Sequence, residues 1–331
     1  MNTQNKLMPL EEVNQLIDAG HILSIAGHEE LLRQLHKGNW MAGTTPYFMD
    51  KDGGGVDYTQ VFVTDLTDIL TNFKIKTYTE DTVTTTMLEE RYDNGFSLII
   101  LPAFSSIHQT YALQAGEQTT LFDKPVMGWI AGIHLEKIGQ VSPKVIDGST
   151  GEVFENRAAV LHGELPHNQY AEIDIVNIYD QGDSDTFTFE ENTFKCTTCM
   201  INGISTNLAD YYKANNIDST LPLVANYAGA SINISIESIN EETHSVSFFA
   251  PLLKGREYKV AQSVEDKYTT FCALLPEDET PIIFSCNCIL NYVHIGMQNK
   301  FAGELKGPFT FGEVAYILVN QTMVTLSIKN L

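Results

Sequence analysis

Three strand-like segments near the C-terminus constrain this chain more than any other feature. They carry hydroxyl, thiol or amide side chains at positions where a core strand normally carries Val, Ile or Leu. The segments are Pro281–Cys288, Gly307–Val314 and Asn320–Ile328. Buried polar groups need hydrogen-bond partners, which neighbouring strands or a bound ligand can supply. We therefore predict that the three segments form adjacent strands and hold the functional site.

The length and composition predict a folded protein of two lobes. The chain has 331 residues, 43% of them hydrophobic and only 19% charged, which suits two cores or one large two-lobed unit. In the first half, apolar strands alternate with amphipathic helices, which predicts a sheet covered by helices. The predicted strands are 22–26, 58–62, 74–78 and 96–101, and the predicted helices are 10–17, 28–37, 81–92 and 105–114.

The second half shows a different pattern. Turn signals separate alternating strands, which is typical of an antiparallel sheet. We predict strands at 171–179 and 186–194, and helices at 205–215 and 263–275, the last opened by a capping pattern at Ser263. The prediction is an α+β fold with an N-terminal helix in residues 1–20, one lobe over 21–182 and another over 183–331.

The strongly acidic balance limits the partners. With 20 basic and 42 acidic residues the net charge is −22, which disfavours nucleic acid and anionic membranes because these need clustered Lys and Arg. The N-terminus lacks the features of a signal peptide, and no apolar run is long enough to cross a bilayer. Five cysteines do not form a disulfide framework. These observations predict a cytoplasmic protein.

The motifs for metal or nucleophilic chemistry are weak. A zinc site could draw on Cys196, Cys199, Cys286 and Cys288, but a C-x-C pair in a strand points to opposite faces. The sequence His162 to His167 contains a glycine and a proline that exclude a metalloprotease helix, so we interpret its histidines as exposed turn residues. The stretch Gly53–Gly55 lacks the Lys of a phosphate loop and reads as the turn of a hairpin. We expect no metal and no cofactor.

For three polar residues, the sequence is compatible with either a structural or a functional role. Cys286 is either a core thiol or a nucleophile, and nothing nearby indicates a lowered pKa. Glu313 sits among aromatic residues and next to Gly312, so it either holds an ammonium group or makes structural hydrogen bonds. Asn320, like Gln321 beside it, either satisfies backbone groups or orients a ligand.

The same residues resemble a known family. Phe284-Ser285-Cys286, then Gly307 to Glu313, then Asn320 to Val324 is similar to the end of FIST domains, which are bacterial sensory modules. Trp40 to Thr45 resembles, more loosely, a glycine turn in the first half of that family. The family has an Arg soon after the Cys, where this chain has Asn287-Cys288-Ile289. The resemblance implies a two-part α+β module, FIST N-like over 21–182 and FIST C-like over 183–331, that binds small ligands such as amino acids.

These observations lead to one main hypothesis and two rivals. The main one is a cytoplasmic sensory protein that binds a small polar molecule, an amino acid or a related metabolite, and signals through a partner protein or a homo-oligomer. Trp40 and Tyr47 either close its pocket or pack in the core. The rivals are a hydrolase or transferase that uses Cys286 or Glu313 in the same cleft, and a scaffold that has lost its pocket. The predicted ligand-binding residues are Gly43, Thr44, Ser285, Cys286, Asn287, Gly312, Glu313 and Asn320.

Overall fold

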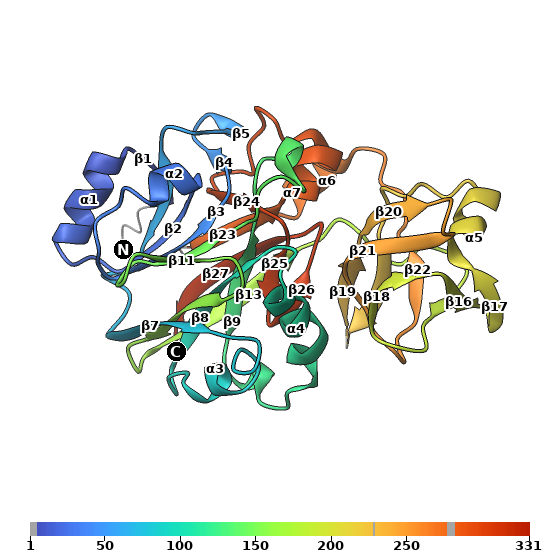
Figure 1. Cartoon of the computed structure of the whole chain (residues 1–331), viewed down its shortest axis with the longest axis horizontal. Helices are drawn as coiled ribbons and strands as arrows, with labels where there is room; N and C mark the ends of the chain where they lie inside the picture. The colour runs from blue at the N-terminus through green and yellow to red at the C-terminus, as the bar shows by residue number, and fades with distance from the viewer. Residues whose placement is uncertain (1–4, 228, 277–281) are drawn as a thin grey trace.

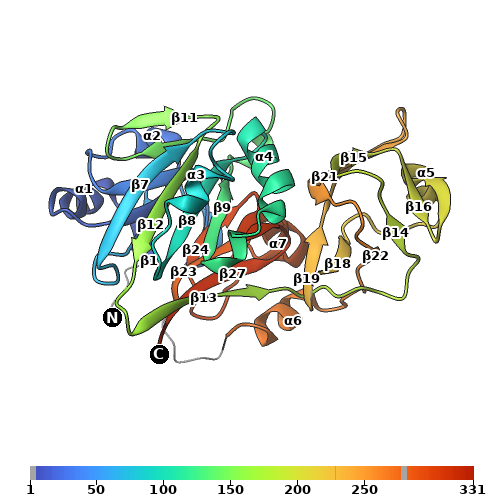
Figure 2. The same cartoon turned by 90° about the horizontal axis from the view of Figure 1, so that it is seen from below.

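The computed structural model describes residues 5–227, 229–276 and 282–331. They form a mixed α+β fold with several sheets. Figure 1 shows most elements gathered on the left, and a smaller group of strands with α5 on the right. We call residues 5–176 and 263–331 the main body, and residues 177–262 the inserted segment. Figure 2 shows β13 (Gln169–Val176) leading from the main body toward the inserted segment.

The first sheet of the main body is buried on both faces. Leu23 and Ile25 pack with Val13 and Ile17 of α1 (Leu10–Asp18), whereas Ala26 belongs to the larger core on the other face. This follows from the two-residue period of strand side chains. The strand order is β1 (Asn5–Met8), β6 (Val61–Asp65), β2 (Leu23–Gly27), β3 (Trp40–Thr44), β10 (Val145–Asp147) and β11 (Glu152–Phe154), with α2 (Glu29–Leu32) beside β2.

The second sheet has two long apolar strands, β8 and β9, at its centre. Six central residues of β8, 96–101, are buried, and α4 packs against that strand. Ser105 caps α4 by accepting a hydrogen bond from the His108 backbone at 3.3 Å. The strand order is β26 (Ile317–Val319), β25 (Glu313–Ala315), β9 (Val126–Ala131), β8 (Gly95–Pro102), β12 (Ala158–Glu164) and β7 (Asn72–Tyr78); the helices are α3 (Thr86–Glu89) and α4 (Ser106–Gln114).

The third sheet brings the three polar C-terminal segments together. β27 pairs with β23, and β23 pairs with β24, so parts of the three segments form adjacent strands, whereas Glu313 and Val314 of the second segment lie in β25 of the second sheet. Residue 281 of the first segment lies outside the described residues. The strand order is β13, β27 (Met323–Asn330), β23 (Ile282–Cys288), β24 (Gly307–Thr310), β4 (Tyr47–Asp50) and β5 (Gly53–Val56); the neighbouring helices are α6 (Lys267–Ala273), α7 (Ile289–Asn291) and a π-helix at Tyr292–Gly296.

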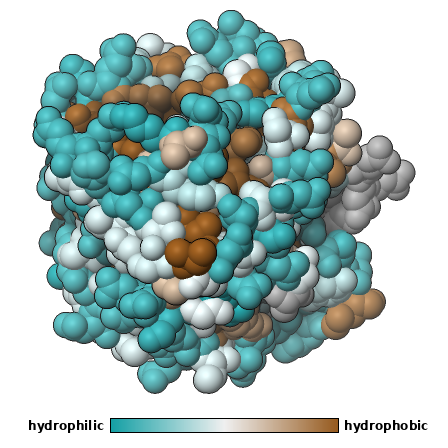
Figure 3. Space-filling view, turned by 90° about the vertical axis from the view of Figure 1, so that its right-hand side faces the viewer, coloured by the Kyte–Doolittle hydropathy of each residue, from teal (hydrophilic) through white to brown (hydrophobic). Residues whose placement is uncertain are grey.

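The inserted segment has two sheets of its own, with antiparallel pairing throughout its described strands. Figure 3 looks onto its outer side, where hydrophilic residues cover most of the surface and hydrophobic ones show in smaller patches. One sheet has the order β17 (Ile204–Asn207), β16 (Thr198–Ile201), β14 (Phe187–Thr188), β22 (Tyr258–Val260), β18 (Leu223–Tyr227), β19 (Ala230–Ile234). The other has β15 (Thr193–Cys196), β21 (Ser245–Leu252), β20 (Ile236–Asn240), and α5 is Leu208–Ala214.

Strand pairing crosses the boundary predicted at residue 182. β24 pairs with β4, and β25 pairs with β9, so the last strands of the chain complete sheets that begin in its first half. The described helices include none with the length and apolar character needed to span a membrane.

Several predicted elements differ from the structure. The glycine stretch is itself the strand β5, paired with β4, and the predicted strand at 58–62 lies in another sheet as β6. A Cβ at Gly54 would lie 2.4 Å from the Met297 carbonyl, so this strand needs glycine for a close backbone approach. The helices predicted at 28–37 and 81–92 are reduced to the single turns α2 and α3.

Two further predictions need correction. Asp266, rather than Ser263, caps α6, because its side chain accepts a hydrogen bond from the Thr269 backbone. His162 is not an exposed turn residue. It lies fully buried in β12, within 2.8 Å of both the Tyr78 hydroxyl and the Ser97 hydroxyl. His162 belongs to a buried strand, in which alternate side chains face the core, and the turn signal comes only from the residues that follow it.

Candidate ligand-binding groove

Parallel strands from all three sheets of the main body end close to one another. Parallel neighbours finish at the same edge of a sheet, and open α/β sheets bind ligands outside that edge. The Gly132 backbone after β9 donates to the Thr44 carbonyl at the end of β3, at 2.7 Å. The Thr45 hydroxyl donates to the Phe309 carbonyl of β24, at 2.8 Å. The parallel pairs are β2 with β3, β8 with β9, and β23 with β24.

Three adjoining hollows line this edge, and together we call them the strand-end groove. The aromatic pocket, about 150 Å³, and the loop pocket, about 620 Å³, share Ala103, Phe104, Ile138 and Glu237. The loop pocket and the Thr44 pocket, about 450 Å³, share residues 141 and 142. The groove thus follows the loop after β9 past the ends of strands from several sheets.

The aromatic pocket lies between the main body and the inserted segment. The Phe104 and Phe311 rings, from the ends of β8 and β24, meet edge to face with centroids 5.9 Å apart. Phe194 of the inserted segment meets His108 of α4 in the same way, at 6.2 Å. The remaining lining residues are mostly apolar: Ala103, Gln109, Leu135, Ile138, Glu237, Phe248, Phe249, Ile289 and Leu290.

Phe104 has an unusual conformation for a large residue. Its φ is +62°, a left-handed backbone that disfavours side chains with a Cβ, and its side chain is 47% exposed. An exposed ring on a strained backbone at the mouth of a pocket is a feature that clusters at functional sites.

Two titratable side chains line the aromatic pocket. His108 is only 7% exposed, and its Nε2 has no hydrogen-bond partner among the described residues. Burial lowers the pKa of His108 to about 4, so its imidazole is neutral at pH 7. Glu237 still reaches solvent, but the protein atoms around its carboxyl partly desolvate it and raise its pKa.

The Thr44 pocket is more polar. The His134 ring, in the loop after β9, stacks on Tyr47 with centroids 5.4 Å apart, and His28 meets Tyr58 edge to face at 5.1 Å. Glu29 also lines this pocket and accepts a hydrogen bond from Lys144 at 2.5 Å. Burial raises the pKa of Glu29, but the hydrogen bonds from Lys144 and Arg33 outweigh it and leave the pKa lowered.

Of the predicted binding residues, Thr44 alone lines one of these hollows. Its hydroxyl accepts a hydrogen bond from the Lys144 backbone at 2.9 Å. Gly43 serves packing, because a Cβ there would lie 2.6 Å from both Ile100 and Trp129. Trp40 packs in the core behind the first sheet, where its indole donates to the His36 carbonyl.

The structure does bring Asn287, Cys286 and Glu313 together, but inside the core. Glu313 is fully buried, with Oε1 2.9 Å from the Thr310 hydroxyl and Oε2 2.8 Å from the Thr322 hydroxyl. The Thr310 hydroxyl also lies 3.3 Å from the Asn287 carbonyl, which can only accept. The contact with Glu313 is the shorter of the two, and the Thr310 hydroxyl donates to Glu313 Oε1. We call this group the Glu313 cluster.

Burial is the main cause of the pKa shifts in the cluster. Burial raises the pKa of Glu313 well above its usual value, and the hydrogen bonds from Thr322, Thr310 and Cys288 oppose this only in part. Burial also raises the pKa of the Cys286 thiol, which donates to the Gly128 carbonyl at 3.6 Å. Burial therefore favours the protonated form of both the Glu313 carboxyl and the Cys286 thiol.

The remaining predicted residues make structural contacts. The Ser285 hydroxyl donates to the Lys306 carbonyl at 2.8 Å. Gly312 forms the tight turn between β24 and β25, with φ +139°. Asn320 joins the main body to the inserted segment, because its Oδ1 accepts hydrogen bonds from the Ser235 hydroxyl at 2.7 Å and the Ser235 backbone at 3.0 Å.

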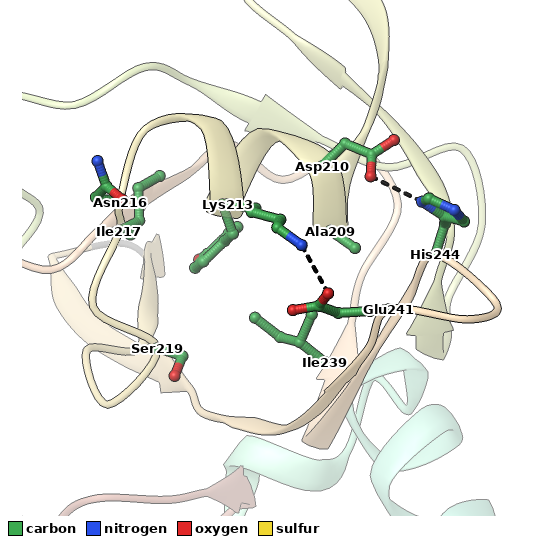
Figure 4. A pocket seen from close by; sticks show the side chains of 10 residues that line it. Ala209, Asp210, Lys213, Asn216, Ile217, Ser219, Ile239, Glu241 and His244 are labelled. Carbon is green, nitrogen blue, oxygen red and sulfur yellow. Dashed lines mark hydrogen bonds and ion pairs between the residues drawn. The ribbon is translucent and has the colours of Figure 1, made fainter.

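A further hollow of about 310 Å³ lies on the inserted segment beside α5. Figure 4 shows Lys213 and Glu241 facing each other across it, with Asp210 and His244 paired to one side. The first pair is 2.6 Å apart and the second 2.7 Å. Because these charges already satisfy one another, the hollow is a weaker candidate than the strand-end groove.

Sequence reasoning missed His108, Phe104 and Glu237. A strand, a short loop and a capped helix were visible at 96–114, and that order places the loop at the carboxyl end of a strand. Glu237 lies in another part of the chain, and only the packing of the inserted segment brings it to the groove.

The fold and the groove define a mixed α+β protein with hollows at the carboxyl ends of its parallel strands. Residues 8–329 match the model of DUF6976, a family of unknown function, and the chain belongs to this family. No curated protein matches the chain. Membership of this family does not assign an activity or a ligand.

Proposed function

We propose that this protein binds a small molecule in the strand-end groove and serves as a sensory protein. The observation that carries the proposal is the position of the groove: strands from three sheets end there, and the inserted segment closes its aromatic pocket. Small-molecule sites are mostly apolar hollows with a few polar groups, often between structural units. The aromatic pocket has this composition.

A ligand in the aromatic pocket would contact both parts of the molecule. Phe104 and Phe311 belong to the main body, and Phe194 and Phe248 to the inserted segment. A ligand that binds one relative arrangement of these parts more tightly shifts the population toward it. This supports a sensory role in which the two parts are the signalling element. The same proposal includes four further points: a two-lobed module, a resemblance to FIST domains, a cytoplasmic location, and a signalling partner or homo-oligomer.

The enzyme alternative draws no support from the site geometry. A nucleophile or an acid must reach its substrate, but the side chains of Cys286 and Glu313 are both 0% exposed. The raised pKa of the Cys286 thiol further disfavours the reactive thiolate.

Thermal unfolding against a panel of metabolites, amino acids included, tests the proposal. A ligand at 100 times its dissociation constant should stabilise the protein by about 2.7 kcal/mol. Phe104→Ala should abolish this stabilisation, because it removes a ring of the aromatic pocket and leaves the φ strain in place. Phe301→Ala is the matched control, since Phe301 is 49% exposed and lies outside the groove. The proposal fails if no compound stabilises the protein, or if both variants respond like the wild type.

A further inference from the structure

The charged side chains that line the aromatic and loop pockets are both acidic, and one of them, Glu155, lies 3.6 Å from Lys144. Glu237 lines both pockets and Glu155 lines the loop pocket, and no Lys or Arg is among the residues that line either. No ion pair links Glu237 to another group in the described part of the chain, and its pKa is raised by desolvation with no contribution from a nearby charge. The Glu237 side chain is exposed and its carboxylate is only partly desolvated, and without an ion-pair partner it favours a positively charged group beside it.

The size of the aromatic pocket indicates which apolar group of a ligand could bind beside the Glu237 carboxylate. An apolar cavity of about 150 Å³ accommodates a single benzene ring. The pocket has about this volume, and the rings of Phe104, Phe194 and Phe311 are among the side chains that line it. The loop pocket, which shares Glu237 with it, leaves room for a chain that extends from the ring.

His108 is compatible with a cation at this place. Its imidazole lines the aromatic pocket, is neutral at pH 7 and has an Nε2 without a hydrogen-bond partner among the described residues. A neutral imidazole does not repel an ammonium group in the pocket.

We propose that the aromatic pocket binds an aryl-alkyl amine, with the ring between Phe104, Phe194 and Phe311 and the ammonium group at Glu237. This inference rests on the proposed function and specifies its ligand class. A free amino acid fits less well, because its carboxylate would lie near Glu237 and Glu155 with no cationic side chain lining either pocket. The charges of the groove thus favour a different ligand from the one that the sequence resemblance implies.

The experiment compares three probes of similar size by isothermal titration calorimetry. These are 2-phenylethylamine, its neutral analogue 2-phenylethanol and phenylalanine. The amine should bind about five- to tenfold more tightly than the alcohol, which is the range for one charge-assisted contact at a partly exposed carboxylate. Phenylalanine should bind more weakly than both.

Four variants locate the effect within the pocket. Glu237→Gln should remove the preference for the amine and leave the affinity for the alcohol unchanged, since Glu237 reaches solvent and its amide is isosteric. Phe104→Ala should weaken both probes, and Phe301→Ala should weaken neither. Rescue of the amine preference by Glu237→Asp would support a charge effect.

Several outcomes would overturn the ligand class. These are an amine that binds no better than the alcohol, an amine preference that survives Glu237→Gln, or tighter binding of phenylalanine. If none of the three probes binds but another metabolite stabilises the wild type and not Phe104→Ala, the ligand class falls and the proposed function stands. If no compound of any class binds in the groove, both fall.

Discussion

The Glu313 cluster and the strand-end groove both contain polar side chains of types that often bind ligands, but these side chains have different surroundings in the two regions. In the cluster, polar side chains within strands satisfy one another, and Glu313 is 0% exposed. In the aromatic pocket of the groove, mostly apolar side chains after the strand ends leave space, and the Nε2 atom of His108 has no hydrogen-bond partner among the described residues. Polar residues inside a strand therefore indicated a self-contained network, whereas the accessible site is formed by the loops that follow.

The largest expected effect concerns the carboxyl of the Glu313 cluster. Glu313→Ala should lower the free energy of unfolding by about 3–5 kcal/mol at pH 5, because it opens a cavity and removes the partner of two buried threonine hydroxyls. Urea denaturation measures this. Glu304→Ala, at an exposed position, should stay within about 0.5 kcal/mol of the wild type. Equal effects of the two substitutions would contradict the buried network.

The second effect is a pH dependence of stability. The unfolded chain ionises Glu313 with a pKa of about 4.3, while the native protein keeps the proton because burial raises the pKa. Above that pH the native state binds more protons than the unfolded state, so stability is lost as pH rises, by about 1.4 kcal/mol per unit, up to the folded pKa.

Glu313→Gln isolates this contribution, because an amide can make the same hydrogen bonds and does not titrate. The difference in unfolding free energy, variant minus wild type, should therefore increase between pH 5 and pH 7. Denaturation curves at several pH values measure it, and parallel pH profiles of the two proteins would show that Glu313 is ionised in the native state.

A smaller effect is expected where the main body meets the inserted segment. Asn320→Ala should cost about 1–2 kcal/mol, because the Ser235 backbone loses a buried acceptor while the Ser235 hydroxyl keeps Gln321 as a partner. Asn330→Ala, at an exposed site, serves as the control. Hydrogen exchange should show faster opening around residue 235 in the first variant, and unchanged exchange there would argue against a linking role.

The smallest effect on stability should come from the groove. Phe104→Ala should change the unfolding free energy by about 1 kcal/mol or less, because half of the ring is already in solvent and the backbone strain is retained. The same variant should lose ligand-induced stabilisation. A large loss of stability in Phe104→Ala, compared with Phe301→Ala, would mean that the ring is a core residue.

Local patterns predicted the elements whose periodicity is strong. Three predicted elements correspond to α1, β8 and α4: the helix at 10–17, the strand at 96–101 and the helix at 105–114. They could be predicted because the apolar pattern that identifies such an element lies within a short stretch of sequence. Pairing across the chain was not predicted. Gly53–Gly55 read as a turn, since the backbone of residues 297–300 against which it packs is far away in sequence.

The candidate site was harder to predict for a physical reason. A polar residue in a strand is conspicuous in a sequence whether its partner is a ligand or a neighbouring threonine, so Glu313 and Asn320 attracted attention. Phe104 and Glu237 are ordinary residue types for a loop and an edge strand. Their importance depends on the empty volume between them, which exists only in the assembled fold.

The pairing of β24 with β4 also has a consequence for biosynthesis. The strand β4 near residue 48 pairs with β24 near residue 308, so the third sheet cannot be completed until residue 308 has left the ribosome. Contacts of such long sequence separation slow folding and leave strand edges exposed meanwhile. The nascent chain should therefore depend on chaperones for longer than a protein whose sheets close in chain order.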